Sequence, residues 1–181
     1  EDGIRDYKVT GVQTCALPIW KALESNTTLT YLDLSNYAGG CEPIGPSGAS
    51  ALARALLKNS TLKCLVLLFN SIRDLGALAF ADALLTNSSL TQLDLTRNGI
   101  SGLGTEAICK ALRMQSNHVM THLILDHNTI GDSGAEALAR ALQSPATQLS
   151  GLRLVRCEIT SLGVETLAGA LQTNRSLTHL H

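Results

Sequence analysis

A pattern of leucines with a long period is the feature that most restricts the fold of this chain. The pattern Leu-x-x-Leu-x-Leu-x-x-Asn-x-Ile begins, with at most two substitutions in a copy, at residues 29, 62, 90, 120 and 149, and a shortened copy begins at residue 177. A unit of 28 to 33 residues cannot bury its own apolar face, so neighbouring units must stack on one another. The sequence therefore predicts an elongated array of about five repeats.

Each unit divides into a strand and a helix. In the strand half, the leucines at unit positions 4 and 6 alternate with outward positions 3, 5 and 7. In the helix half, apolar residues such as Ala77, Phe80, Ala81 and Leu84 recur at the i, i+3, i+4, i+7 spacing of one buried face. Strands pack about 4.8 Å apart and helices about 8–10 Å apart, so the array must curve. We expect an α/β solenoid shaped as a right-handed horseshoe arc, with parallel strands on the concave face and helices on the convex face.

Unit position 9 carries a polar residue inside an apolar pattern. It is Asn70, Asn98 and Asn128 in three units and Cys157 in the next. An asparagine amide can donate to and accept from the backbone of the bend that follows the strand. Stacked units are therefore expected to form a buried asparagine ladder. Tyr37 replaces the asparagine in the first unit, where about five extra residues around 38–43 predict a local bulge.

A second set of asparagines recurs where each helix joins the next strand. These residues are also glycosylation sequons: Asn26, Asn59, Asn87 and Asn174. Their fixed place in the repeat favours a structural role, in which the asparagine ends the helix and a Ser or Thr caps the turn. Glycosylation is the alternative, and it would require a secreted protein.

The helix halves carry a family resemblance. The run Asn-x-Ile-x-Asp-x-Gly-Ala-x-Ala-Leu-Ala-x-Ala-Leu, best matched at residues 72–84 and 128–142, resembles the ribonuclease-inhibitor subtype of leucine-rich repeats. The Asn-Ser-Thr-Leu and Asn-Ser-Ser-Leu joints at residues 59–62 and 87–90 most resemble the C-terminal repeats of NLR receptors, which are cytosolic NACHT-domain sensors. This resemblance covers essentially all of residues 20–181.

The resemblance implies a non-catalytic, cytoplasmic protein–protein interaction module that forms the ligand-sensing or autoinhibitory repeats of an NLR-like receptor. A regulator resembling Ran GTPase-activating protein or ribonuclease inhibitor is the alternative, and an extracellular recognition domain is a third possibility. The sequence contains no Gly-x-x-x-x-Gly-Lys-Ser/Thr motif, so nucleotide chemistry is not expected in these residues.

Composition and spacing argue against most other functions. The net charge of −1 and the 3% of aromatic residues disfavour a nucleic-acid surface, and no signal-peptide core or membrane segment is evident. No catalytic constellation is present. His122 and His179 are expected about 10 Å apart, too far to share a metal, and the cysteines show no Cys-x-x-Cys spacing. We therefore expect no enzyme activity, no metal and no cofactor.

The first nineteen residues do not fit the repeat. Residues 1–19 resemble the in-frame translation of a sequencing adapter with a six-base index, so we interpret them as a non-native tail. Residues 20–181 then form a leucine-rich-repeat fragment that is truncated at both ends, since its first helix lacks a strand and its last strand stops at residue 181. Exposed apolar ends and frayed terminal strands are expected.

Outward strand positions supply the candidate binding site. Val66, Leu68 and Phe69 are expected to form an exposed apolar cluster, and the positions beside them carry mixed charges with a basic rim. This combination suits a protein ligand with hydrophobic and acidic elements on the concave face. The predicted partner-binding residues are Tyr31, Asp33, Val66, Leu68, Phe69, Asp94, Arg97, Asp126, His127, Arg153 and Arg156.

Overall fold

Helices and strands alternate along the whole described part of the chain. The computed structural model describes the backbone of residues 13–37, 42–114 and 119–181, and the side chains in these ranges from residue 19 onward. The helices are α1 (Gln13–Ser25), α2 (Gly45–Leu56), α3 (Arg73–Leu84), α4 (Gly102–Arg113), α5 (Gly131–Leu142) and α6 (Ser161–Leu171). The strands are β1 (Tyr31–Asp33), β2 (Cys64–Val66), β3 (Gln92–Asp94), β4 (His122–Ile124), β5 (Gly151–Arg153) and β6 (His179–Leu180).

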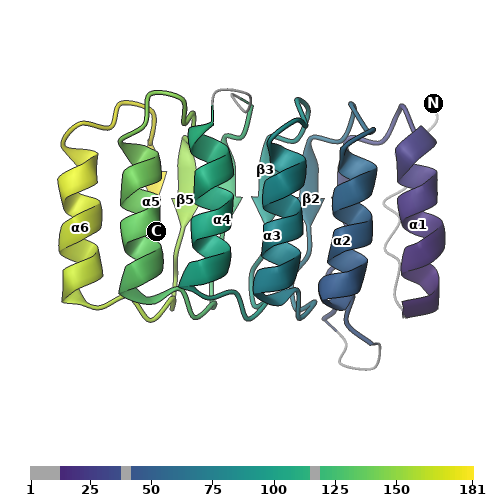
Figure 1. The fold of residues 1–181 in the computed structure, drawn as a ribbon, viewed down its shortest axis with the longest axis horizontal. Helices are drawn as coiled ribbons and strands as arrows, with labels where there is room; N and C mark the ends of the chain where they lie inside the picture. Colours follow the sequence, from purple (N-terminus) through teal and green to yellow (C-terminus); the bar gives the residue numbers. More distant parts are fainter. Residues whose placement is uncertain (1–12, 38–41, 115–118) are drawn as a thin grey trace.

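The six strands form one parallel sheet in chain order, and the helices form a row that covers one side of it (Figure 1). The register places equivalent residues side by side, so that Leu32, Leu65, Leu93, Leu123 and Leu152 form one buried row. The predicted α/β solenoid is confirmed. We call the side of the sheet away from the helices the sheet face, and the outer surface of the helices the helix face.

The predicted ladder at unit position 9 is present and buried. The side-chain oxygen of Asn98 accepts from the backbone N–H groups of Asn70 and Ile72 at 3.0 and 3.3 Å, and its amide donates to the carbonyl of Leu67 at 2.8 Å. Asn128 serves the next unit in the same way, accepting from the N–H groups of Asn98 and Ile100 at 3.0 Å. Each asparagine therefore ties its own bend to the preceding unit.

The sequon asparagines form a second ladder, and their predicted structural role is confirmed. The amide nitrogen of Asn87 donates to the carbonyls of Leu56 and Asn59 at 2.7 and 3.0 Å, while its oxygen accepts from the N–H of Leu90 at 2.8 Å. Asn59 and Asn87 are both buried. A glycan on either amide nitrogen would break these bonds, so the folded repeat has no room for one at these two residues.

The N-termini of two helices are capped by a carboxylate from the preceding helix, and the sequence pattern did not predict this capping. Asp132 of α5 accepts from the backbone N–H and the hydroxyl of Thr160 and from the N–H of Gly163, at 2.6 to 3.1 Å, and so caps α6. Asp74 of α3 caps α4 in the same way. These hydrogen bonds, above all the one from the Thr160 hydroxyl, lower the pKa of Asp132.

Some expectations meet the structure only in part. Helix α1 begins at Gln13 and crosses the expected boundary at residue 19, so that boundary does not coincide with the start of an element. The adapter origin of residues 1–19 stays a prediction. The expected bulge at 38–43 lies mostly outside the described residues. The last strand is exposed, as expected, with Leu180 at its surface.

Replacing Asn98 with Ala is expected to lower the free energy of unfolding by about 3 kcal/mol, because two buried N–H donors and one carbonyl lose their partner together. Urea denaturation followed by circular dichroism measures this loss. Gln143→Ala on the exposed C-cap of α5 is the control, and it should change stability by less than about 0.5 kcal/mol. Equal stability of the two variants would contradict the ladder's role.

Candidate functional site

The sheet face carries the residues that the sequence nominated, and the register decides which of them are neighbours. Asp33, Val66, Asp94, Ile124 and Arg153 lie on consecutive strands in one row. The row is acidic on β1 and β3 and basic on β5. Its charge therefore changes sign along the array.

Unit position 8 forms a second row, just beyond the ends of the strands. Phe69, Arg97, His127 and Arg156 all have a left-handed backbone, with φ between 55° and 60°. This conformation costs about 1 kcal/mol or more in a residue with a side chain. Hydrogen bonds to the next unit hold it, such as Phe69 N–H to Thr96 at 3.1 Å and His127 N–H to Val155 at 2.7 Å. The repeat thus aligns one aromatic and three basic-type side chains on adjacent units.

Two members of this row, Phe69 and Arg97, form an aromatic–cation cluster with Tyr37. The rings of Tyr37 and Phe69 lie 6.0 Å apart and tilted by 59°, and the guanidinium of Arg97 lies over the Phe69 ring at 5.0 Å. Phe69 remains 38% exposed, and Tyr37 is more exposed still. Sequence reasoning nominated Phe69 and Arg97 but missed Tyr37. The sequence signal for Tyr37 is its departure from asparagine at position 9, which by itself predicts only a bulge.

The sequence predicts an exposed apolar patch of three residues, and this prediction is wrong for one of them. Val66 is only 8% exposed, and Leu68 is half-buried. Val66 lies on β2, which has a strand on each side, and is flanked in register by Asp33 and Asp94 on those strands. A short branched side chain between two strands is covered by its neighbours. The exposed apolar element is therefore Phe69 with Tyr37.

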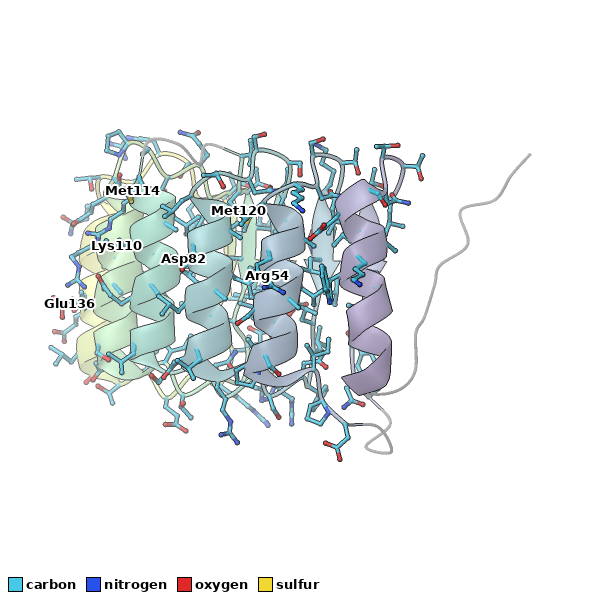
Figure 2. All side chains as sticks on the ribbon, turned by 45° about the vertical axis from the view of Figure 1, so that its right-hand side comes forward. Arg54, Asp82, Lys110, Met114, Met120 and Glu136 are labelled. Carbon is cyan, nitrogen blue, oxygen red and sulfur yellow. The ribbon has the colours of Figure 1, made fainter. Side chains whose placement is uncertain are left out.

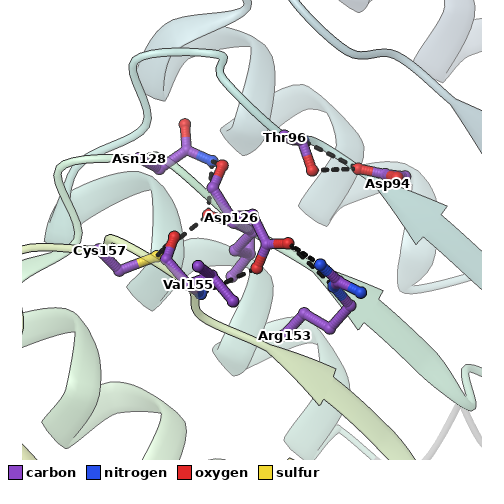
Figure 3. Close-up of polar contacts among 8 residues, drawn as sticks. Asp94, Thr96, Asp126, Asn128, Arg153, Val155 and Cys157 are labelled. Carbon is purple, nitrogen blue, oxygen red and sulfur yellow. Dashed lines mark hydrogen bonds and ion pairs between the residues drawn. The ribbon is translucent and has the colours of Figure 1, made fainter. Parts of the chain in front are cut away.

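Asp126 is also not a surface contact residue. It is 5% exposed, and its carboxylate accepts from Nε and Nη2 of Arg153 at 2.8 and 2.6 Å and from the N–H of Val155 at 2.8 Å (Figure 3). Burying a carboxylate requires such partners. Asp126 therefore acts as a support that holds the guanidinium of Arg153, whose side chain is about half exposed, on the sheet face.

The other acidic candidates are tied to their own strands. Asp33 accepts from the N–H and hydroxyl of Ser35, and Asp94 does the same with Thr96. Burial raises the pKa of Asp94, although the hydrogen bonds from Thr96 oppose this shift. Of the remaining candidates, Tyr31 and Arg156 are exposed and His127 is half-buried.

The described part of the chain gives two observations on thiol protonation and on metal-ligating side chains. Burial raises the pKa of the Cys64 thiol to about 11 and that of Cys109 to about 12, so both remain protonated at neutral pH. Within ranges 19–37, 42–114 and 119–181, no group of three or more His, Cys, Asp and Glu side chains could hold a metal ion. No helix of the described part has both the length and the apolar character that a membrane span requires.

Asp94→Asn is expected to stabilise the protein at neutral pH. A raised pKa means that the folded state disfavours the ionised carboxylate, which the variant removes. As the pH falls through the raised pKa toward 3.8, Asp94 of the wild type becomes protonated and its unfavourable contribution to the free energy of unfolding disappears. The stability advantage of the variant should therefore shrink over this pH range.

Asp132→Asn should have the opposite effect and destabilise the protein at neutral pH, because the pKa of Asp132 is lowered. Its stability deficit should shrink below pH 3.8. Urea denaturation from pH 7 to 3 tests both variants, and the same sign for both at pH 7 would contradict this assignment.

Comparisons with known proteins agree with this architecture. A model of the leucine-rich repeat family matches residues 25–53, 58–81, 86–109 and 116–139, which together are more than half of the chain. A solved structure of leiomodin-1 actin-binding site 2 superimposes with a TM-score of 0.69 over 86% of each chain, at 23% sequence identity. No curated protein matches the sequence. With its stacked strands, helices and asparagine ladder, the chain belongs to the leucine-rich repeat family.

Proposed function

We propose that this chain is a protein–protein interaction module that binds its partner on the sheet face. The observation that carries the proposal is the cluster of Tyr37, Phe69 and Arg97, in which two exposed rings lie beside a cation. Aromatic and arginine side chains are enriched at the centres of protein interfaces, where one residue supplies both apolar area and a polar contact. A fold that orders such residues on a fixed scaffold needs little reorganisation to bind.

The spacing of the strands suggests the chemistry of the partner. Arg97 is one strand from Phe69 and Arg156 is three, which correspond to about 5 and 14 Å across the sheet. An extended peptide advances about 3.3 Å per residue. A peptide lying across the strands would therefore fit this surface if an aromatic or leucine side chain contacts Phe69. Acidic residues about one to two and about four positions later would then reach Arg97 and Arg156. Arg153, held by Asp126, adds a second cation at the far end.

Two further observations support a protein partner. The leiomodin-1 structure carries the name actin-binding site 2, so a related fold presents a protein-binding surface. The Asn-Ser-Thr-Leu and Asn-Ser-Ser-Leu joints resemble those of NLR receptors, and the specific proposal is the ligand-sensing or autoinhibitory repeats of such a cytoplasmic receptor. A regulator resembling Ran GTPase-activating protein or ribonuclease inhibitor remains the second proposal. The full-length transcript separates them, since an upstream P-loop belongs to the receptor only.

Selection of a random dodecapeptide display library on the immobilised chain tests the binding proposal. We expect enriched peptides to share one aromatic or leucine residue followed by Asp or Glu within about four positions. Phe69→Ser combined with Arg156→Glu should lower the affinity of a synthetic enriched peptide by at least about 100-fold, measured by fluorescence anisotropy.

Lys110→Glu on the helix face is the matched control, because it makes the same charge reversal at an exposed residue away from the sheet. It should leave peptide affinity unchanged. Enrichment of peptides without acidic residues, or equal affinity for the wild type and the double variant, would contradict the proposed surface.

A further inference from the structure

The helix face contains a groove that the proposed function does not use. It runs between α2 and α3, has a volume of about 470 Å³, and is floored mainly by small side chains. Its lining residues are Ser47, Ser50, Ala51, Ala53, Arg54, Leu57, Ala79, Asp82 and Ala83. A groove between two helices with a floor of small residues can admit larger side chains from another helix layer.

One cation on α2 and one anion on α3 line this groove. Arg54 is the tenth residue of α2 and Asp82 is the tenth residue of α3, so both lie at the same level on neighbouring helices. In the described part of the chain, neither one forms an ion pair, although Arg54 lies over the Trp20 ring at 5.5 Å. Figure 2 shows both residues on the helix face, with Lys110 and Glu136 on the following helices.

The neighbouring part of the helix face is different. Between α4 and α5, Arg140 pairs with Glu106 and Glu136 at 2.5 and 2.6 Å, and Arg113 pairs with Glu106 at 3.5 Å. Four charged residues there, Glu106, Arg113, Glu136 and Arg140, therefore form ion pairs within one molecule. Among the described residues, an ion pair thus connects α4 with α5, whereas no ion pair connects α2 with α3.

Side chains at equivalent places along α2 and α3, beside and within the groove, differ in size. On α3, Leu75 and Leu78 are the third and sixth residues, and Leu78 is 49% exposed. The third and sixth residues of α2 are Ser47 and Ser50. Above the charges, Leu57, which is 54% exposed, and Leu85 occupy the C-cap positions of the two helices. At equivalent positions along the two helices, a leucine of one helix therefore lies beside a serine or a leucine of the other. The cation Arg54 and the anion Asp82 occupy equivalent positions in the same way.

We infer that this groove is the interface of a symmetric dimer of this chain. A two-fold axis that lies in the interface and runs along the groove places α2 of one protomer against α3 of its partner at the same level. Arg54 then faces Asp82 of the partner subunit, and this contact occurs twice. Leu75 and Leu78 face the small side chains of the partner's Ser47 and Ser50. The sheet face remains open, so dimerisation and peptide binding are separable.

Charge reversal gives a sharp test, because the interface pairs each charge with the opposite one in the partner. Arg54→Asp places two acidic groups together at both contacts, and Asp82→Arg places two basic groups together. Each variant alone is expected to raise the dimer dissociation constant by at least about 100-fold. An equimolar mixture of the two variants restores both opposite-charge contacts and should dimerise like the wild type.

Sedimentation equilibrium at protein concentrations between about 1 and 100 µM measures the dimer dissociation constant. Transient dimers typically dissociate in roughly this concentration range. Lys110→Asp is the control, since it reverses a charge at the equivalent place on α4 and should leave dimerisation unchanged. Leu78→Ala, a second variant without charge change, should weaken the dimer about tenfold. Thermal unfolding of each variant verifies that it is folded.

Two outcomes would overturn the inference. A wild type that stays monomeric at 100 µM shows that this groove binds no second copy, which leaves a helix of another protein as its occupant. A dimer that persists in both single variants, or a mixture that fails to associate, places any self-association elsewhere, for example at the exposed apolar residues Leu162, Val164 and Leu180. Neither outcome affects the peptide-binding proposal, which concerns the opposite face.

Discussion

The structure depends on satisfying backbone groups that stacking buries. Each unit leaves its strand through a bend whose N–H and carbonyl groups lie inside the array, where water cannot reach them. Asn98 and Asn128 supply one acceptor and two donors each, and they bond to backbone of the preceding unit. Asn59 and Asn87 do the same at the opposite end of the strands. Because these bonds connect units, they hold all strands in one register.

This register determines the chemistry of both faces. Because the strands are in register, equivalent residues of successive units lie at a constant spacing. The side chains on each face therefore form rows that run across the units. On the sheet face, the left-handed residues at position 8 form one such row, with Phe69 beside Arg97. On the helix face, ion pairs connect α4 with α5, whereas a groove lies between α2 and α3. The proposed surfaces lie on opposite sides and do not compete.

The strand–helix repeat, its parallel register and the position-9 ladder could all be predicted from the sequence, because they rest on local periodicity and on a polar residue inside an apolar pattern. The same reasoning nominated Phe69, Arg97 and Arg153 as outward residues. It also treated Val66 and Asp126 as exposed, which was wrong. Alternation says which side of a sheet a residue faces, but not how far the neighbouring strands cover it.

The sequence alone thus determined the architecture, since the repeat dictates a helix and a strand in every unit and leaves stacking as the only way to bury leucine. Tertiary structure decided the details of the sites. The tilted ring contact of Tyr37 with Phe69, the capping of α4 by Asp74 and the pairing of Asp126 with Arg153 all join residues about one repeat apart. Such contacts depend on the distance between side chains in adjacent units, and that distance exists only once the units are stacked.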